Sequence, residues 1–69
     1  MPEKVILANR LVKIRKEMRQ NQTDFAWAIG ISVEALSLIE RQKYNPSLET
    51  LQKIAAYTGL TVSELLQID

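Results

Sequence analysis

The chain has 69 residues, enough for one small domain, and carries a formal net charge of +1. It contains no cysteine and no histidine, which excludes disulfides, thiolate or imidazole catalysis and the commonest zinc sites. No apolar run approaches the roughly 18 residues of a membrane span. We therefore expect a cytoplasmic protein with no membrane association, no metal and no cofactor.

The first expected element is a helix over about residues 5–19. Four apolar residues recur there at intervals of three or four positions, the spacing of one helix face. They are Leu7, Leu11, Ile14 and Met18. This stripe, Met18 included, predicts that one side of the helix packs into the core. The lysines and arginines between these residues fit either a solvent-exposed face of the helix or a surface that contacts DNA phosphates.

Two short helices, over about residues 22–29 and 33–40, are expected next. Asn21 is a good N-cap for the first, and Gly30 ends it because glycine adopts a left-handed backbone at least cost. Ser32 then caps the second helix. Two helices joined by such a turn form a helix-turn-helix, whose second helix can enter the major groove of DNA.

Two further helices are expected over about residues 48–58 and 62–67. Ser47 and Thr61 are their N-caps, and Gly59 lies between them. No segment has the pattern of a strand, so the predicted fold is an all-α domain of five helices. Its expected core consists of Leu7, Leu11, Ile14, Phe25, Ile29, Leu36, Ile39, Leu51, Ile54 and Leu65.

The stretch from residue 22 to residue 40, with its flanks, resembles the XRE-type helix-turn-helix family of phage repressors and Cro proteins. Six spaced positions carry the family's residue types: Gln22, Ala26, Gly30, Leu36, Ile39 and Glu40. Residues 45–51 and 60–66 resemble the segments around the family's fourth and fifth helices. The resemblance covers roughly residues 6–66 and implies a lambda-repressor-like domain with a central helix-turn-helix.

The resemblance also places Arg15 at the family's first-helix arginine, which pairs with a glutamate at the end of the recognition helix, here Glu40. A partly buried guanidinium needs a carboxylate partner, and arginine offers a bidentate fork. We therefore expect a structural ion pair between Arg15 and Glu40, and we leave Arg15 out of the DNA contacts.

By the same resemblance, the first residues of helix 33–40 and those one turn later face the bases. A glutamine at the start of the preceding helix contacts the DNA backbone or a base near the edge of the half-site. The expected base-reading residues are Gln22, Val33, Glu34, Ser37 and Leu38. Within helix 33–40 this set lacks arginine, asparagine and glutamine, the side chains with good bidentate pairings to guanine and adenine. Val33 and Leu38 can contact thymine methyl groups, and Glu34 can accept from a cytosine amino group.

The expected phosphate contacts flank the reading helix: Asn21, Arg41, Lys43 and Tyr44. Tyr44 fits a packing role equally well. Gln42 stands where the family usually has glycine, just past the end of the recognition helix. Because glutamine adopts a left-handed backbone only at a cost, we expect this helix end to be shaped differently.

These observations predict a sequence-specific, DNA-binding transcriptional regulator, a repressor, that reads the major groove with helix 33–40. Double-stranded DNA is the expected partner, and the family resemblance implies a homodimer that forms through the C-terminal apolar residues Leu60, Val62, Leu66 and Ile68. Residues 1–45 hold eight lysines and arginines against five acids, a net charge of +3, whereas residues 46–69 hold one against three, a net charge of −2. The alternative is a protein-interaction module, or an antitoxin-like protein partner with weak or partner-dependent DNA binding, that uses Val33, Leu38 and Trp27. Trp27 fits an exposed contact residue and a partly buried edge of the core equally well. An enzyme is the least favoured class, because the chain lacks a polar constellation for catalysis.

Overall fold

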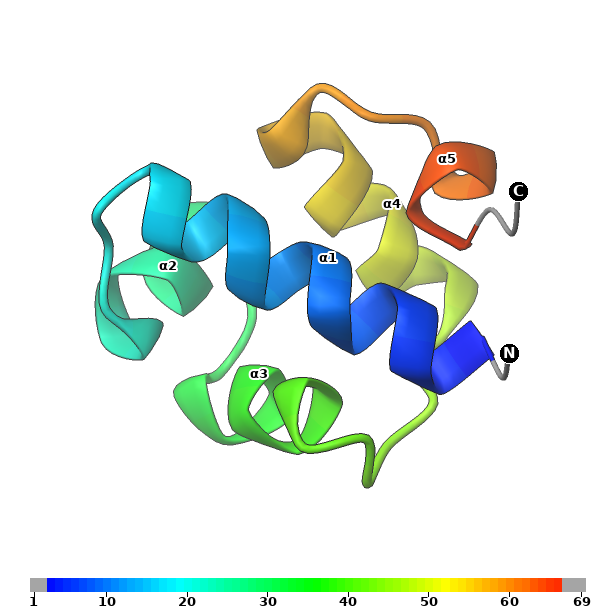
Figure 1. The fold of residues 1–69 in the computed structure, drawn as a ribbon, viewed down its shortest axis with the longest axis horizontal. Helices are drawn as coiled ribbons and strands as arrows, with labels where there is room; N and C mark the ends of the chain where they lie inside the picture. The colour runs from blue at the N-terminus through cyan, green and yellow to red at the C-terminus, as the bar shows by residue number, and fades with distance from the viewer. Residues whose placement is uncertain (1–2, 67–69) are drawn as a thin grey trace.

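Five helices follow one another in the computed structural model, which describes residues 3–66. They are α1 (Glu3–Glu17), α2 (Gln22–Ile29), α3 (Val33–Glu40), α4 (Leu48–Thr58) and α5 (Val62–Leu66). Helix α1 crosses the front of the molecule in Figure 1, with α3 below it and with α4 and α5 above and behind. It packs against α3 and α5, while α2 packs against α3 and α4. The predicted all-α, five-helix fold is confirmed.

None of the helices in residues 3–66 is long and apolar enough to cross a lipid bilayer. The last turn that was expected at residue 67 lies outside the described part of the chain.

Helix α1 begins and ends two residues earlier than the sequence predicts. Its end is closed by a Schellman motif, in which the N–H of Gln20 donates to the carbonyl of Arg15 at 3.1 Å and that of Arg19 donates to Lys16 at 3.0 Å. Arg19 takes the left-handed backbone of this motif, with φ of 58°. Because the chain turns here, Met18 is 43% exposed, and its predicted place in the core is wrong.

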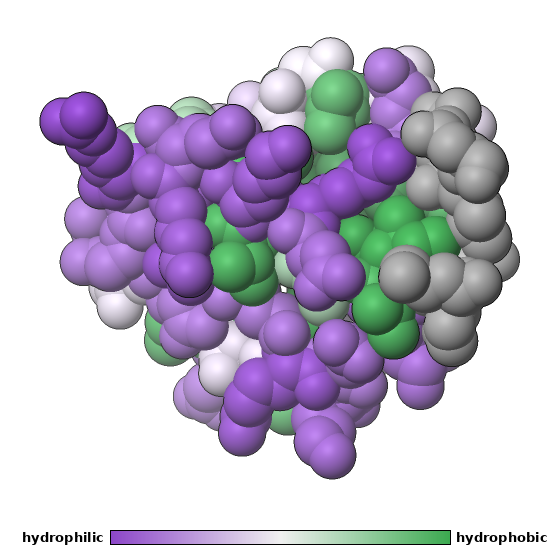
Figure 2. Space-filling model, in the orientation of Figure 1, coloured by the Kyte–Doolittle hydropathy of each residue, from purple (hydrophilic) through white to green (hydrophobic). Residues whose placement is uncertain are grey.

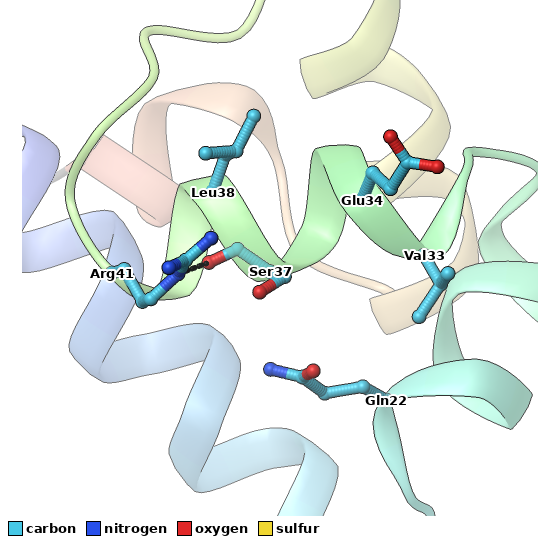
Figure 3. A pocket seen from close by; sticks show the side chains of 6 residues that line it. All are labelled: Gln22, Val33, Glu34, Ser37, Leu38 and Arg41. Carbon is cyan, nitrogen blue, oxygen red and sulfur yellow. Dashed lines mark hydrogen bonds between the residues drawn. The ribbon is translucent and has the colours of Figure 1, made fainter.

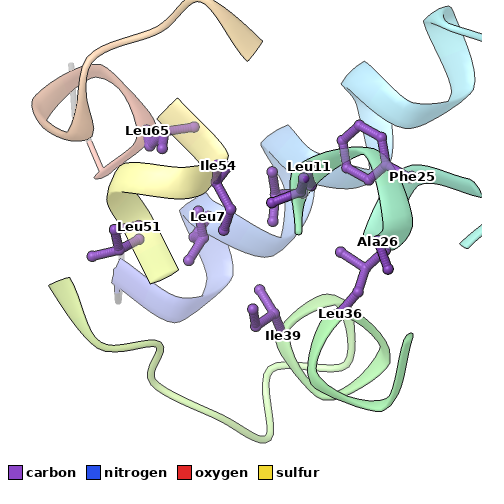
Figure 4. Close-up of a cluster of buried hydrophobic side chains, with 10 residues drawn as sticks. Leu7, Leu11, Phe25, Ala26, Leu36, Ile39, Leu51, Ile54 and Leu65 are labelled. Carbon is purple, nitrogen blue, oxygen red and sulfur yellow. The ribbon is translucent and has the colours of Figure 1, made fainter. Parts of the chain in front are cut away.

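All five helices contribute side chains to one hydrophobic core (Figure 4). Nine of the ten predicted core residues belong to it, and Ile14 packs half-buried against its edge. Ile6 and Ala8 are buried as well, although the predicted stripe omitted them. They are buried because α1 lies between two neighbours, α3 and α5, so that a wider face of the helix is covered than one stripe. Hydrophilic residues cover most of the face of the molecule that Figure 2 shows.

An aromatic contact fixes α4 against α2. The rings of Phe25 and Tyr57 meet edge to face, with centroids 5.8 Å apart and an interplanar angle of 71°. The hydroxyl of Tyr57 donates to Oε1 of Gln20 at 3.1 Å, so this tyrosine also ties α4 to the segment between α1 and α2. Tyrosine combines apolar burial with a satisfied polar group in this arrangement.

Capping interactions define the start of α2 and the turn between α2 and α3. Oδ1 of Asn21 accepts the N–H of Asp24 at 2.8 Å, and Oγ of Ser32 accepts that of Ala35 at 3.0 Å. Gly30 has φ of 95°, a left-handed conformation that a residue with a side chain adopts only with strain. The N–H groups of Gly30 and Ile31 both donate to the carbonyl of Ala26, at 2.9 and 3.0 Å. These bonds fix the angle at which α3 leaves α2.

Candidate nucleic-acid interface

An open hollow of about 390 Å³ lies over α3, and we call it the reading hollow (Figure 3). Its lining consists of Gln22, Val33, Glu34, Ser37, Leu38 and Arg41. All five residues that the sequence suggested for base reading are therefore brought together on one surface. Arg41, which was expected to contact a phosphate, lies on this surface as well.

The lining residues of α3 form two rows. Val33, Ser37 and Arg41 follow one another at intervals of four residues, as do Glu34 and Leu38 in the second row. Figure 3 shows Glu34 and Leu38 pointing to one side of the helix, and Val33 pointing to the side of Gln22. The spacing of four residues from Ser37 is the sequence signal that could have placed Arg41 in the reading hollow.

A hydrogen-bonded ion pair supports the reading hollow from inside. Nε of Arg15 lies 2.8 Å from Oε2 of Glu40, and Nη2 donates to Oε1 at 3.0 Å, so the pair is bidentate. The side chains of Arg15 and Glu40 are 16% and 5% exposed. Nη1 of Arg15 also donates to the carbonyl of Gln20 at 3.2 Å. The ion pair that the resemblance implied is present, and it joins α1 to the end of α3.

Gln22 belongs to this network and to the reading hollow at the same time. Its Nε2 donates to Oε1 of Glu40 at 2.9 Å. A primary amide has two N–H donors and an accepting oxygen, so this bond leaves one donor and the acceptor for a ligand. The network therefore fixes the direction of the Gln22 side chain and preserves its capacity to contact DNA. No sequence pattern indicates the bond between Gln22 and Glu40.

The other expected phosphate contacts, Asn21, Lys43 and Tyr44, are exposed and do not line the reading hollow. Asn21 lies at the start of α2, where its oxygen caps the helix. Lys43 and Tyr44 lie in the segment between α3 and α4. These three residues therefore occupy positions outside the hollow, on segments next to the elements that form it.

The expectation of an altered helix end at Gln42 is wrong. Gln42 has φ of 63°, the left-handed conformation that the family's glycine would take. The N–H of Lys43 donates to the carbonyl of Leu38 at 2.9 Å, and that of Gln42 donates to Ile39 at 3.0 Å, which completes a Schellman motif. Two backbone hydrogen bonds thus offset the conformational cost and set the direction in which Lys43 and Tyr44 leave α3.

The residues suggested for protein contacts lie on separate surfaces. Trp27 is 86% exposed rather than a partly buried edge of the core, but it is not part of the reading hollow that contains Val33 and Leu38. Of the residues expected at a dimer interface, three pack half-buried against the protein's own core and Ile68 lies outside the described residues. The three are Leu60, Val62 and Leu66.

Comparison with known proteins identifies relatives over almost the whole described chain. Residues 11–65 match the model of a helix-turn-helix family. The transcriptional regulator DdrOP3 of Deinococcus deserti is 48% identical over 61 residues, which cover 88% of this chain and 47% of that protein. The immunity repressor protein of Bacillus phage phi105 is 38% identical over 60 residues, covering 87% of this chain and 42% of the repressor. This chain thus spans less than half the length of either relative.

Two further similarities cover most of this chain and most of the matched protein. The control protein C.MunI of a Mycoplasma species is 43% identical over 63 residues, covering 90% of this chain and 85% of that protein. A crystal structure described as a hypothetical transcription factor, NHTF from Neisseria, superposes with a TM-score of 0.86 and 26% identity over 96% of this chain and 76% of that one. With the family match and the geometry of α2 and α3, these similarities show that the chain belongs to the XRE-type helix-turn-helix family.

Proposed function

We propose that this chain is a sequence-specific DNA-binding transcriptional regulator, a repressor, that inserts α3 into the major groove. The observation that carries the proposal is the reading hollow, in which the outward residues of α3 and Gln22 at the start of α2 form one surface. The relatives named as transcriptional regulators and as a phage repressor support the same function.

In this proposal the start of α2 meets the DNA backbone. The first N–H groups of a helix and its dipole favour an anion such as a phosphate. Asn21 and Lys43, both exposed, supply further donors on either side of the groove, and Tyr44 adds a hydroxyl. Phosphate contacts of this kind fix the orientation of the protein on the duplex but carry no sequence information.

Base reading is then the task of the lining of the reading hollow. Val33 and Leu38 are 40% and 37% exposed and offer apolar contacts to thymine methyl groups. Glu34 accepts a hydrogen bond from a cytosine amino group, and Ser37 can donate or accept. Gln22, held by Glu40, contacts a base at the edge of the half-site. We further propose a cytoplasmic homodimer on an inverted repeat, because two half-sites supply the affinity that one such surface lacks.

The test is fluorescence anisotropy of the chain with a pool of random duplex DNA at about 50 and about 200 mM salt, followed by sequencing of the bound fraction. Binding should fall by orders of magnitude as salt rises, since each neutralised phosphate releases counterions. The bound pool should be enriched in a two-fold symmetric motif. Absence of binding at the lower salt concentration, by protein that circular dichroism shows to be helical, would contradict the proposal.

A second candidate function, a protein-interaction module, is favoured by the exposure of Trp27, since large aromatic residues are enriched at interfaces. The change Trp27→Ala, on the exposed face of α2 outside the reading hollow, distinguishes the two candidates when it is compared with Lys43→Ala. Loss of a protein partner on Trp27→Ala, with no effect of Lys43→Ala, would favour the interaction module. Loss of DNA affinity on Lys43→Ala, with none on Trp27→Ala, would favour the regulator.

A further inference from the structure

Arg41 is the one cation among the six residues that line the reading hollow. It follows the last residue of α3, but its backbone, with φ of −90° and ψ of 4°, stays close to the helical region. Its N–H donates to the carbonyl of Ser37 at 3.0 Å, the bond that a helical residue would make. Arg41 therefore continues the row formed by Val33 and Ser37 by one more turn.

The side chain of Arg41 lies along α3 beside the hollow (Figure 3). Its Nε donates to the carbonyl of Ser37 at 3.4 Å, and this bond holds the guanidinium next to the helix. The terminal nitrogens Nη1 and Nη2 have no hydrogen-bonding partner within residues 3–66. A forked pair of donors is thus available at the surface that faces the bases.

No other residue of the lining offers a guanine two donors in a fork: Gln22 has one free N–H and Ser37 has one O–H. Val33 and Leu38 have no polar group, and the carboxylate of Glu34 accepts but does not donate. In the major groove, guanine presents two acceptors, O6 and N7, which the guanidinium fork matches with two parallel hydrogen bonds. The neighbouring cation Lys43 does not line the hollow, which suits it to a phosphate instead.

We propose that Arg41 is a specificity-determining residue that reads a guanine in each half-site, rather than a phosphate contact. This inference rests on the proposed function, since it assigns one base to the surface that enters the groove. It gives the reading hollow the bidentate contact that α3 itself lacks. The preferred operator would then combine one guanine at a fixed position with neighbouring bases selected by Val33, Glu34 and Leu38.

The test uses the wild-type chain and the variants Arg41→Lys and Arg41→Ala, with Lys43→Arg as the matched control. Arg41→Ala removes the whole guanidinium, whereas Arg41→Lys keeps the charge and replaces the planar fork by one ammonium group, which can still donate to O6 and N7. Each protein is taken through selection from the random duplex pool, and thermal unfolding by circular dichroism establishes that the variants fold. We expect a guanine at one position of each half-site for the wild type and for Lys43→Arg. That preference should fall about 5- to 150-fold in Arg41→Ala, the worth of one bidentate contact.

Modified DNA gives an independent readout. Replacing that guanine by 7-deazaguanine removes the N7 acceptor and should weaken wild-type binding, whereas inosine keeps both O6 and N7 and should not. Neither replacement should alter the binding of Arg41→Ala.

The inference is overturned if the wild type selects a motif without a conserved guanine. It is also overturned if Arg41→Ala keeps the wild-type preference, or if it weakens all duplexes equally. In these cases the proposed function stands, because the wild type still binds DNA. Absence of salt-dependent binding by the wild type would overturn the proposed function and the inference with it.

Discussion

Glu40 accepts hydrogen bonds from Arg15 and Gln22, and its carboxylate is nearly inaccessible to water. Removing one partner of a buried ion pair leaves the other charge without compensation. We therefore expect Glu40→Ala to lower the free energy of unfolding by about 3 kcal/mol, measured by urea denaturation followed by circular dichroism.

Glu40→Gln is the control, because it keeps the shape of the side chain and one accepting oxygen. It should cost less than Glu40→Ala while still leaving Arg15 without a charged partner. A change below about 0.5 kcal/mol in the alanine variant, the range of ordinary surface substitutions, would mean that the pair contributes nothing to stability.

Gln42 holds a left-handed backbone at the end of α3, with φ of 63°. A residue with a Cβ atom adopts this conformation at a cost of about 1–2 kcal/mol that glycine avoids. We therefore expect Gln42→Gly to raise the free energy of unfolding by about 1 kcal/mol.

Gln52→Gly supplies the opposite case, since Gln52 lies exposed in the middle of α4. There the same replacement should destabilise the protein by about 1 kcal/mol. If both variants changed the free energy of unfolding in the same direction, the left-handed backbone of Gln42 would not be the cause of the change in Gln42→Gly.

At the scale of a whole element, the stability of α5 depends on the hydrogen bonds that cap its first turn. Helix α5 has five residues, too few to be stable alone. A reciprocal capping box closes its start: Glu64 Oε1 accepts the N–H of Thr61 at 2.9 Å, and Thr61 Oγ1 accepts that of Glu64 at 3.0 Å. We expect Thr61→Ala to destabilise the protein by about 1 kcal/mol.

Ser63→Ala, an exposed change within the same helix, should stay within about 0.5 kcal/mol of the wild type. Both variants are compared by thermal unfolding. If Thr61→Ala also fell within this range, the capping box would not be what holds α5 in place.

The bounds of the elements were predictable where the sequence contains a cap. Helices α2, α3 and α4 have the expected bounds, because Asn21, Ser32 and Ser47 cap their starts. The end of α1 was not predictable in this way, since Arg19 takes a left-handed backbone with no glycine or asparagine to signal it. The misplaced end is also why Met18 was assigned to the core.

The reading hollow was predictable in its lining but not in its internal contacts. Residue spacing and the family resemblance suggested Gln22 and the outward positions of α3. The bond from Gln22 to Glu40 depends on the angle between α2 and α3, which no local pattern encodes. Arg41 was placed outside the reading set because the helix was expected to end at residue 40, whereas its backbone continues the helical row.

At the scale of the whole molecule, DNA binding depends on a charge distribution rather than on net charge, which is only +1. We expect Lys43→Ala to weaken binding to all duplexes by a similar factor and to lower the slope of log affinity against log salt by about 1. Anisotropy titrations at several salt concentrations measure this slope.

Lys53→Ala removes the same charge from α4, where Lys53 lies 3.8 Å from Glu49 and outside the reading hollow. It should leave the salt slope close to that of the wild type. Equal slopes for Lys43→Ala and Lys53→Ala would indicate that binding follows total charge and has no preferred face.

Trp27 is the chain's one tryptophan, and its ring already lies in water in the folded protein. Its emission maximum should therefore be close to that of an unfolded chain and should report poorly on denaturation. The same property makes it a sensitive optical probe of association. A shift of its emission to shorter wavelength on mixing with another macromolecule would mean that the outer face of α2 has been covered, without any label being attached.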